Sequence, residues 1–471
     1  MVLQRKLTKA IELKYNMRSV KSQIPVNHCL WLIITIFLQI IILFFLLRSS
    51  QQSNTQHAVA LNPSDCQSGY VYVYDLPPAF NKELIDQCHE SDRGCGAVSN
   101  GGFGTKATGL EHVVPRNLTP AWYWTDMYSA EVIFHNRMLS HKCRTLDPEK
   151  AKGFYIPFYA GLDIGKFLFN YSAKDRDRKS EMLLDWLKEQ PTFTRNKGVD
   201  HFIMLSRLTW DFRRLTDNDA DWGSKLLHMP LMRHVFRLSV EKHQNDNLEE
   251  SVPYPTAFHP RSESDIIQWQ NYIRSYKRTK LFSFVGAKRE KIKNDFRGVL
   301  MDYCKSEEDY CGAVDCATGI CSDGATAIME TFLGSDFCLQ PRGDGLTRRS
   351  MFDCMLAGSI PVYFWKGTFK GQYEWHLPWM PESYTVFIDN RDVRATNGSL
   401  ILKVLESIHK DKVKEMRETL INLLPKFVYA RSGEDLGSVK DAFDISIDRV
   451  LKRLEIGRNQ LLTQNQAYFE S

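Results

Sequence analysis

Residues 337–364 hold the sequence feature that most limits the possible folds: two short apolar runs separated by a polar loop and a helix-forming stretch. The first run begins at Phe337 and the second ends at Phe364, and both are rich in residues that favour strands. The pattern predicts a strand, a loop, a helix and a second strand in succession. Such a unit is typical of a parallel sheet covered by helices, so we expect an α/β fold.

The loop of this unit has the composition of an anion site. It contains Arg342, Gly343, Gly345, Arg348 and Arg349. Glycines let backbone N–H groups approach a ligand closely, and the start of a helix carries partial positive charge. Arginine side chains suit a diphosphate, and open α/β sheets bind ligands at the carboxyl ends of their strands. A nucleotide-sugar site is our first hypothesis, and a solvated turn is the alternative.

Two other features bear on this hypothesis. Asp353 lies within the expected helix, where its carboxylate could accept a hydrogen bond from a sugar hydroxyl. A second basic loop, from Gly286 to Arg289, also follows an expected strand and could face the first loop. A structural salt bridge would account for Arg289 equally well. The arginine loop matches neither the Walker pattern nor the dinucleotide fingerprint.

The length of 471 residues allows two domains with separate cores. In the first domain we expect strands at 69–77, 153–159 and 201–206 and a helix at 122–139. In the second we expect strands at 281–286 and 384–389 and helices at about 294–303, 399–409, 412–424 and 441–454. The proline-rich stretch 252–260 is the expected boundary, which gives domains 66–255 and 256–471, the second with the closing helices.

The N-terminal residues predict a membrane anchor. Residues 1–28 carry six basic side chains and one acidic one, and residues 29–47 contain no charge over a length that can cross a bilayer. The positive-inside rule makes residues 1–28 a cytosolic tail and the rest lumenal, with 48–65 as a polar stem. A cleaved signal peptide is the alternative. The tail and Arg48 account for more than the whole net charge of +5, so a basic nucleic-acid surface is not supported.

The cysteines agree with a lumenal location. Ten of the eleven follow the anchor, and an even number in an oxidising compartment favours disulfides. Four of them cluster between residues 304 and 321 and could bind zinc, but their spacing lacks the usual C-x₂-C knuckle. Three N-glycosylation sequons, which begin at Asn117, Asn170 and Asn397, fit the same side of the membrane.

Several candidates in the first domain stay ambiguous at this point. The acidic run from Asp217 to Asp221 could hold a metal ion, but we favour a solvated loop. Four aromatic residues could stack on sugars or belong to the core: Trp122, Tyr123, Trp124 and Tyr128. A general base needs a carboxylate or an imidazole, and the candidates are His135, His201, Asp163 and Asp211. For each of these a structural role is the alternative.

Several segments, in order, resemble the exostosin-like family 47 glycosyltransferases and, within that family, the plant xyloglucan galactosyltransferases. The resemblance runs from about Cys66 to Phe443. It rests on segments 72–77, 134–137, 143–148, 154–161, 209–214, 253–256, 334–344 and 360–362. The most specific of them begins at Gly334 and includes the arginine loop.

The resemblance implies a GT-B fold, in which two Rossmann-like domains face a central active site, in a single-pass type II Golgi membrane protein. It assigns the nucleotide-sugar donor to the C-terminal domain. Carried over, Arg289 and Arg342 would grip the donor diphosphate and Asp353 would hold the ribose. Further donor contacts would come from Gly343, Asp344, Arg348, Arg349 and Ser350. No metal ion or cofactor is expected.

The implied reaction is the inverting transfer of galactose from UDP-galactose to xylose side chains of xyloglucan. The base would lie in the first domain, with Asp163 as first choice and Asp211 as second. Transfer of galacturonic acid, or a non-catalytic Golgi scaffold of the same fold, are the alternatives. Expected partners are the xyloglucan acceptor, the UDP-sugar and the Golgi membrane, and complexes with other Golgi glycosyltransferases are conceivable. No nucleic-acid partner is expected.

Overall fold

The computed structural model describes residue 39 and residues 66–87, 98–169, 171–318, 321, 326–433 and 436–469, with side chains to residue 459. The expected tail and stem, all of the expected anchor except residue 39, Cys88, Cys95 and the sequon asparagine at 170 lie outside these residues. Within the described part of the chain, no helix is both long and apolar enough to cross a membrane.

Six strands form the first sheet, and every pairing in it is parallel. Their spatial order is β4 (Arg144–Thr145), β1 (Tyr70–Val73), β5 (Ala151–Ile156), β6 (His201–Leu205), β7 (Phe236–Ser239) and β8 (Glu249–Ser251). The strands expected near residues 70, 154 and 203 are therefore found as β1, β5 and β6. The expected parallel sheet is confirmed.

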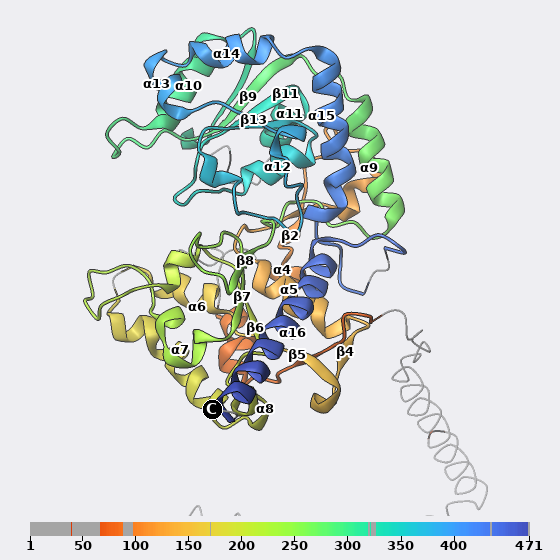
Figure 1. Cartoon of the computed structure of the whole chain (residues 1–471). Coiled ribbons are helices and arrows are strands. Elements are labelled where there is room, and N and C mark those ends of the chain that lie inside the picture. Colours follow the sequence, from red (N-terminus) through yellow and green to blue (C-terminus); the bar gives the residue numbers. More distant parts are fainter. Residues whose placement is uncertain are drawn as a thin grey trace, which may run out of the picture. The chain divides into compact units, whose positions relative to one another are not determined.

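Both faces of the first sheet are apolar because alternate side chains of its buried strands enter different cores. Phe154 and Ile203 belong to one cluster, which includes residues of α6 (Ala160–Phe167) and α7 (Ala173–Lys188). Tyr155 and Phe202 belong to the other, on the face of α5 (Ala130–Ser140). Figure 1 shows α6 and α7 on one side of β6 and α5 on the other. A strand buried on both faces reads as a continuous apolar run.

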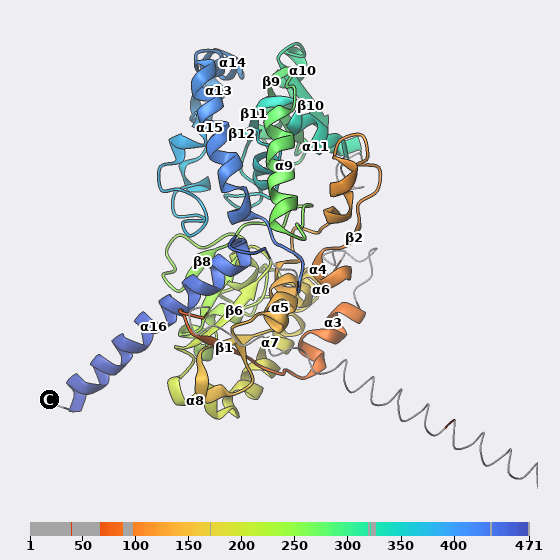
Figure 2. The ribbon, with the colours of Figure 1, turned by 90° about the vertical axis from the view of Figure 1, so that its right-hand side faces the viewer.

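Five parallel strands form the second sheet, in the order β10 (Cys311–Asp315), β9 (Lys280–Gly286), β11 (Ser335–Gln340), β12 (Ile360–Tyr363) and β13 (Val386–Phe387). The helices of this part include α9 (Glu263–Ser275), α10 (Phe296–Ser306), α11 (Thr326–Leu333), α12 (Ser350–Leu356), α13 (Asn390–Ala395), α14 (Ser399–Glu406) and α15 (Lys410–Leu423). Figure 2 shows α9, α10, α11, α13, α14 and α15 around β9, β11 and β12. The segment 337–364 is thus the expected strand–loop–helix–strand unit.

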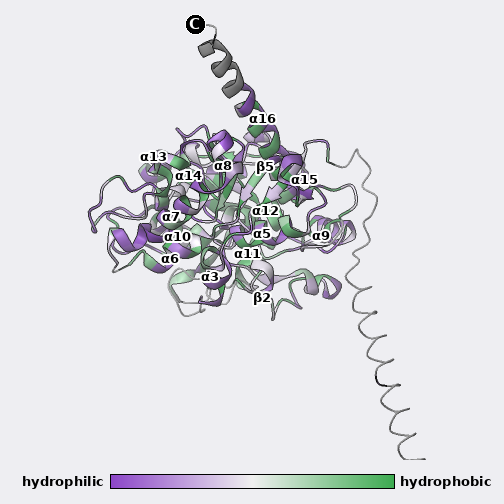
Figure 3. Cartoon of the chain, turned by 90° about the horizontal axis from the view of Figure 1, so that it is seen from below, coloured by the Kyte–Doolittle hydropathy of each residue, from purple (hydrophilic) through white to green (hydrophobic). Residues whose placement is uncertain are grey.

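The C-terminal helix α16 (Ala442–Phe469) packs on the first sheet rather than the second. Leu451 and Leu454 lie over Gly153 of β5, where an added Cβ would come within 2.8 Å of the Leu451 side chain. Just before α16, Asp441 forms an ion pair with Arg137 of α5. Figure 3 shows α16 running from the fold to the C terminus. The helix predicted at 441–454, within the expected second domain, therefore contacts β5 of the first sheet.

Two expected elements differ from the structure. The helix expected at 122–139 begins only at Ala130, because Tyr123–Trp124 is a short strand, β3, paired with β2 (Thr105–Lys106). The Asp126 carboxylate accepts from the Tyr128 N–H at 2.7 Å and forms a turn before the helix. The strand expected at 384–389 is reduced to the two residues of β13.

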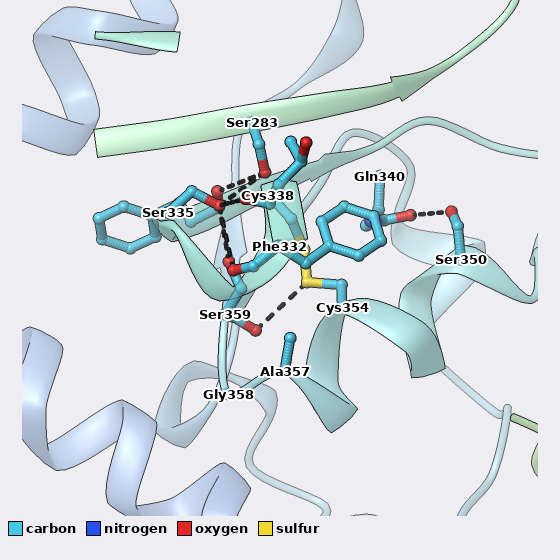
Figure 4. Close-up of a disulfide and its surroundings, with 12 residues drawn as sticks. Ser283, Phe332, Ser335, Cys338, Gln340, Ser350, Cys354, Ala357, Gly358 and Ser359 are labelled. Atoms are coloured by element: carbon cyan, nitrogen blue, oxygen red, sulfur yellow. Dashed lines mark hydrogen bonds between the residues drawn. A yellow bond between two sulfur atoms is a disulfide. The ribbon is translucent and has the colours of Figure 1, made fainter. Parts of the chain in front are cut away.

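Four disulfides lie among the described residues: Cys66–Cys143, Cys304–Cys311, Cys316–Cys321 and Cys338–Cys354. The expectation of disulfides is confirmed for these eight cysteines, and the zinc alternative is excluded because all four clustered thiols are paired. Figure 4 shows Cys338 of β11 bonded to Cys354 of α12. This bond fixes the helix that follows the arginine loop to the strand that precedes it.

Candidate functional site

The arginine loop follows the carboxyl end of β11, and Arg348 is half-buried within it. One Arg348 N–H donates to the carbonyl of Val285 at 3.2 Å, whereas the buried Nη1 atom has no hydrogen-bond partner among the described residues. The pKa of Arg348 is lowered to about 9, chiefly by burial and in part by the guanidinium groups of Arg297 and Arg289. A guanidinium with a buried, unused donor among other cations is an arrangement that an anion would stabilise.

The second basic loop meets the first, as the sequence hypothesis requires. Arg289 Nη2 lies 2.5 Å from the carboxylate of Asp344 in the arginine loop. Arg297, from α10, donates to the backbone carbonyl of Arg342 at 3.4 Å. Burial and the charge of Arg289 lower the pKa of Arg297. The structural-salt-bridge interpretation of Arg289 is also correct, so its side chain would have to exchange Asp344 for a ligand.

Arg342 and Arg349 have different surroundings. Arg342 is exposed, and its guanidinium lies 5.7 Å from the centre of the Trp365 ring. Arg349 pairs with Asp353 at 3.2 Å and also donates to the carbonyl of Thr125, which belongs to the first-sheet part of the chain. Arg342 is therefore free to meet a ligand, whereas the donors of Arg349 hold internal contacts.

α12 positions Asp353 and Ser350 on its first turn. Burial raises the pKa of Asp353, and the charges of Arg349 and Arg348 oppose that rise. The Ser350 hydroxyl donates to the side-chain oxygen of Gln340 at 2.7 Å. Because α12 has only seven residues, the positive field here comes mainly from the guanidinium groups rather than from a helix dipole.

Glu241 is a site residue that sequence reasoning missed. It follows β7 of the first sheet, and its Oε2 accepts from both the N–H and the hydroxyl of Thr347, each at 2.6 Å. The other carboxylate oxygen lies so close to Gly345 that a Cβ there would overlap it. Gly345 is thus required by this close approach rather than by a turn. The available signal was the short stretch 235–240 before Glu241, in which Val, Phe and Leu alternate with Arg237 and Ser239, as in a strand.

The two carboxylates considered as bases have different environments. Asp163 is buried in α6, and burial raises its pKa to about 7. No described residue is a hydrogen-bond partner of its Oδ1. The charges that act on it are Lys179, Arg178 and Lys166, all on α6 or α7. Asp211 accepts from Arg207 Nε at 2.7 Å and from the indole N–H of Trp222 at 2.6 Å.

The two histidine candidates have structural roles. His135 Nδ1 lies 2.7 Å from the Tyr159 hydroxyl, and burial lowers its pKa to about 4. His201 is fully buried between Tyr74 and Asp200, with 2.7 Å to each, and burial lowers its pKa as well. Both imidazoles therefore have hydrogen-bond partners within the first-sheet part of the fold.

The four aromatic candidates divide between core and site. Trp122 and Tyr123 are buried in the core, and Trp124 is half-buried. Tyr128 is half-buried, and the guanidinium of Arg207 lies 4.3 Å from the centre of its ring. Burial raises the pKa of Tyr128 to about 12. Tyr128 therefore belongs to the Arg207–Asp211 cluster.

The acidic run 217–221 is built into a loop. The Asp219 carboxylate accepts from the Ala173 N–H at the start of α7 at 2.6 Å. Asp217 pairs with Lys225 at 3.1 Å, and Asp221 accepts from Thr216. Each carboxylate has a structural partner, which agrees with the solvated-loop interpretation. Nowhere in the described ranges do three or more metal-ligating side chains gather.

Comparison with known proteins gives strong matches over most of the chain. The exostosin GT47 domain profile matches residues 65–404. Xyloglucan galactosyltransferase XLT2 of Arabidopsis thaliana is 48% identical over 465 residues, which is 91% of this chain and 89% of that protein. Xyloglucan galactosyltransferase MUR3 of the same plant is 39% identical and covers 86% of this chain and 66% of its own length.

A relative named for a different sugar is more distant. Xyloglucan-specific galacturonosyltransferase 1 of Arabidopsis thaliana is 36% identical over 83% of this chain and 58% of its own length. Among solved structures, the lipopolysaccharide glycosyltransferase WaaG matches with a TM-score of 0.26 at 10% identity, over 43% of this chain and 65% of its own. A similarity at that level carries no weight for function or for the relative placement of domains.

Proposed function

The chain belongs to the exostosin GT47 family of glycosyltransferases, and from that premise we propose that it transfers galactose from UDP-galactose to xylose side chains of xyloglucan. Two relatives, XLT2 at 48% identity and MUR3 at 39%, are named as xyloglucan galactosyltransferases. We also propose a GT-B arrangement, which is supported by the two parallel sheets and by the family.

The observation that carries the donor site is the buried Nη1 atom of Arg348, which has no hydrogen-bond partner in the described part of the chain and lies beside Arg289 and Arg297. A diphosphate placed there would give that N–H an acceptor and neutralise the mutual repulsion of the guanidinium groups. Exposed Arg342 would close over the same diphosphate. Gly343 brings the loop backbone close to Thr347, where any side chain would overlap the carbonyl. Asp353 is the proposed ribose contact.

The proposed chemistry is a direct displacement at the anomeric carbon. The acceptor hydroxyl attacks the face opposite UDP, which inverts the α-linkage of the donor to a β-linkage in the product. Negative charge grows on the leaving diphosphate, and the arginines stabilise it without a metal ion. Support for metal independence is the cationic loop itself, together with the structural use of the Asp217–Asp221 carboxylates.

For the base we propose Asp211 rather than Asp163. Asp211 is hydrogen-bonded to Arg207, whose guanidinium lies over the Tyr128 ring. Tyr128 is three residues after Thr125, and the Thr125 carbonyl accepts a hydrogen bond from Arg349 of the arginine loop. This chain of contacts leads from Asp211 to the arginine loop. The charges that surround Asp163 lie instead on α6 and α7. Asp211→Asn should remove most transfer, and near-normal turnover would reject this role.

We further propose a single-pass type II Golgi location, with residues 66–471 in the lumen. The uncharged stretch 29–47, the basic tail and the disulfides support it. The Golgi membrane and other glycosyltransferases of that compartment are the corresponding proposed partners. Protease protection of intact Golgi vesicles would test the topology, since a cytosolic catalytic part would be digested.

The proposed activity is tested by giving the full-length protein a xylosylated glucan oligosaccharide and a panel of UDP-sugars, with a chelator present. Transfer of one hexose from UDP-galactose is the expected result. Transfer from UDP-galacturonic acid alone would establish the other sugar, and absence of turnover with every donor would favour a scaffold.

A further inference from the structure

Three large aromatic side chains gather at the surface beside Asp211. Phe169, Trp210 and Trp222 are 45%, 38% and 39% exposed. The Trp222 ring is central, with its centroid 5.4 Å from that of Phe169 and 5.6 Å from that of Trp210. A contiguous exposed aromatic surface is unfavourable in water and commonly marks a binding site.

The central ring of this aromatic platform is held in place from below. The Trp222 indole N–H donates to Oδ1 of Asp211, whose Oδ2 is held by Arg207. Both Asp211 and Arg207 are buried. Trp222 therefore presents its ring in one orientation, which reduces the entropy lost when a ligand stacks on it.

The platform is also connected to the proposed donor site. Arg207 lies over Tyr128, and Tyr128 closely follows Thr125, which is bound by Arg349 of the arginine loop. The carboxylates of Asp211 and Asp344 both act on Tyr128 electrostatically. Contacts thus connect the platform to the arginine loop through Asp211, Arg207 and Tyr128. An acceptor chain whose reacting sugar lies at Asp211 would therefore have the platform beside it.

We propose that Phe169, Trp210 and Trp222 form an acceptor subsite that stacks on sugar rings of the xyloglucan chain flanking the xylose that receives galactose. The inference rests on the proposed function and adds the surface that selects a long acceptor. Pyranose rings expose apolar C–H faces that pack on aromatic rings while their hydroxyls stay in water. The subsite binds the xyloglucan chain and does not contact the reacting atoms, which lie at Asp211 and the arginine loop.

The test compares Trp210→Ala with Trp379→Ala in the full-length protein. Trp210→Ala removes one ring and retains the Trp222–Asp211 hydrogen bond. Trp379 is the matched control, since it is 86% exposed and lies outside the platform, in the second-sheet part of the chain. Trp210→Ala should raise the acceptor KM about tenfold for a long xylosylated oligosaccharide, with kcat and the UDP-galactose KM unchanged. Trp379→Ala should leave all three values unchanged, and Trp210→Phe should restore the acceptor KM.

A binding measurement separates this inference from the proposed function. The long oligosaccharide should quench tryptophan fluorescence in the parent protein. The oligosaccharide concentration that gives half-maximal quenching should be higher in Trp210→Ala. Saturable quenching without galactose transfer would sustain the subsite and refute the proposed function. Normal transfer by a folded Trp210→Ala variant, with an unchanged acceptor KM, would overturn the subsite and leave the function standing. An equal rise in the UDP-galactose KM would also overturn it.

Discussion

Glu241 holds Thr347 through two hydrogen bonds to a single carboxylate oxygen, one from the backbone N–H and one from the hydroxyl, each 2.6 Å long. Glu241 follows a strand of the first sheet, and Thr347 lies in the arginine loop after a strand of the second. The loop proposed to bind UDP is therefore shaped by a residue from the other sheet. Donor binding and the first-sheet part of the chain are mechanically linked through this contact.

The first prediction concerns this link. Glu241→Ala should raise the UDP-galactose KM about tenfold or more, because both donors of buried Thr347 lose their acceptor and the loop is no longer held. Gly345→Ala should have a similar effect, since its Cβ would displace the same carboxylate. Initial rates at varied UDP-galactose measure both.

Combining the two substitutions provides the control. Because both act on one contact, the double variant should be little worse than either single variant. Fully additive losses would show that Glu241 and Gly345 act independently, which would contradict the link.

The second prediction concerns the arginines. Arg348→Ala and Arg342→Ala should each lower kcat/KM by about 10²-fold or more, because each removes a donor from the charge that develops on the diphosphate. Arg391→Ala is the matched control, since that side chain is 84% exposed and pairs with nearby Asp389. Calorimetry should show weaker UDP affinity in Arg348→Ala and Arg342→Ala, and unchanged affinity in Arg391→Ala. An Arg348→Ala protein that binds UDP normally would disprove the diphosphate assignment.

The third prediction separates Asp163 from catalysis. Its pKa is raised to about 7 by burial, so the ionised form is unfavourable in the folded state. This group therefore favours folding least at high pH: its contribution falls as pH rises from the unfolded pKa near 4 through 7. Asp163→Asn should therefore stabilise the protein more at pH 8 than at pH 5, which a larger rise in Tm at pH 8 would show. The gain in unfolding free energy should differ between the two pH values by an amount on the order of 2 kcal/mol.

The same variant should retain galactose transfer within a few fold of the parent. Thermal melts at the two pH values and one activity assay are sufficient. A collapse of kcat with unchanged melting behaviour would return Asp163 to the role of base.

The fourth prediction concerns the Cys338–Cys354 bond, which spans the arginine loop. Replacing both cysteines by alanine should lower stability by roughly 3 kcal/mol, the typical contribution of a disulfide closing a loop of this length. Because α12 then loses its attachment to β11, the UDP-galactose KM should also rise. Replacing Cys316 and Cys321 should lower stability without the change in KM, since that pair lies in a different loop.

The sequence predicted the second sheet and the donor loop better than the first-sheet contacts. Apolar runs around Phe154, Phe202 and Phe337 mark buried parallel strands because such strands carry apolar residues on both faces. The loop chemistry was likewise visible, because arginines and glycines cluster within a few residues of a strand end. Local patterns of this kind determine local structure.

Long-range partners could not be predicted from local patterns. The Glu241–Thr347 contact joins residues 106 positions apart, and the Arg349–Thr125 contact joins residues 224 apart. The packing of α16 on β5 depends on Leu451 and Leu454, whose side chains lie against Gly153, where there is no side chain. Trp122 to Trp124 was expected to be helical because its aromatic spacing suits a helix, but pairing with Thr105 and Lys106 overrode that preference.

The most direct measurement of the central claim is the structure of the product. NMR of a xylosylated oligosaccharide after incubation with the protein and UDP-galactose should show one new galactose on a xylose, with the large anomeric coupling of a β-linkage. An α-linked galactose, or galactose attached to the glucan backbone, would contradict the proposed inverting transfer to xylose.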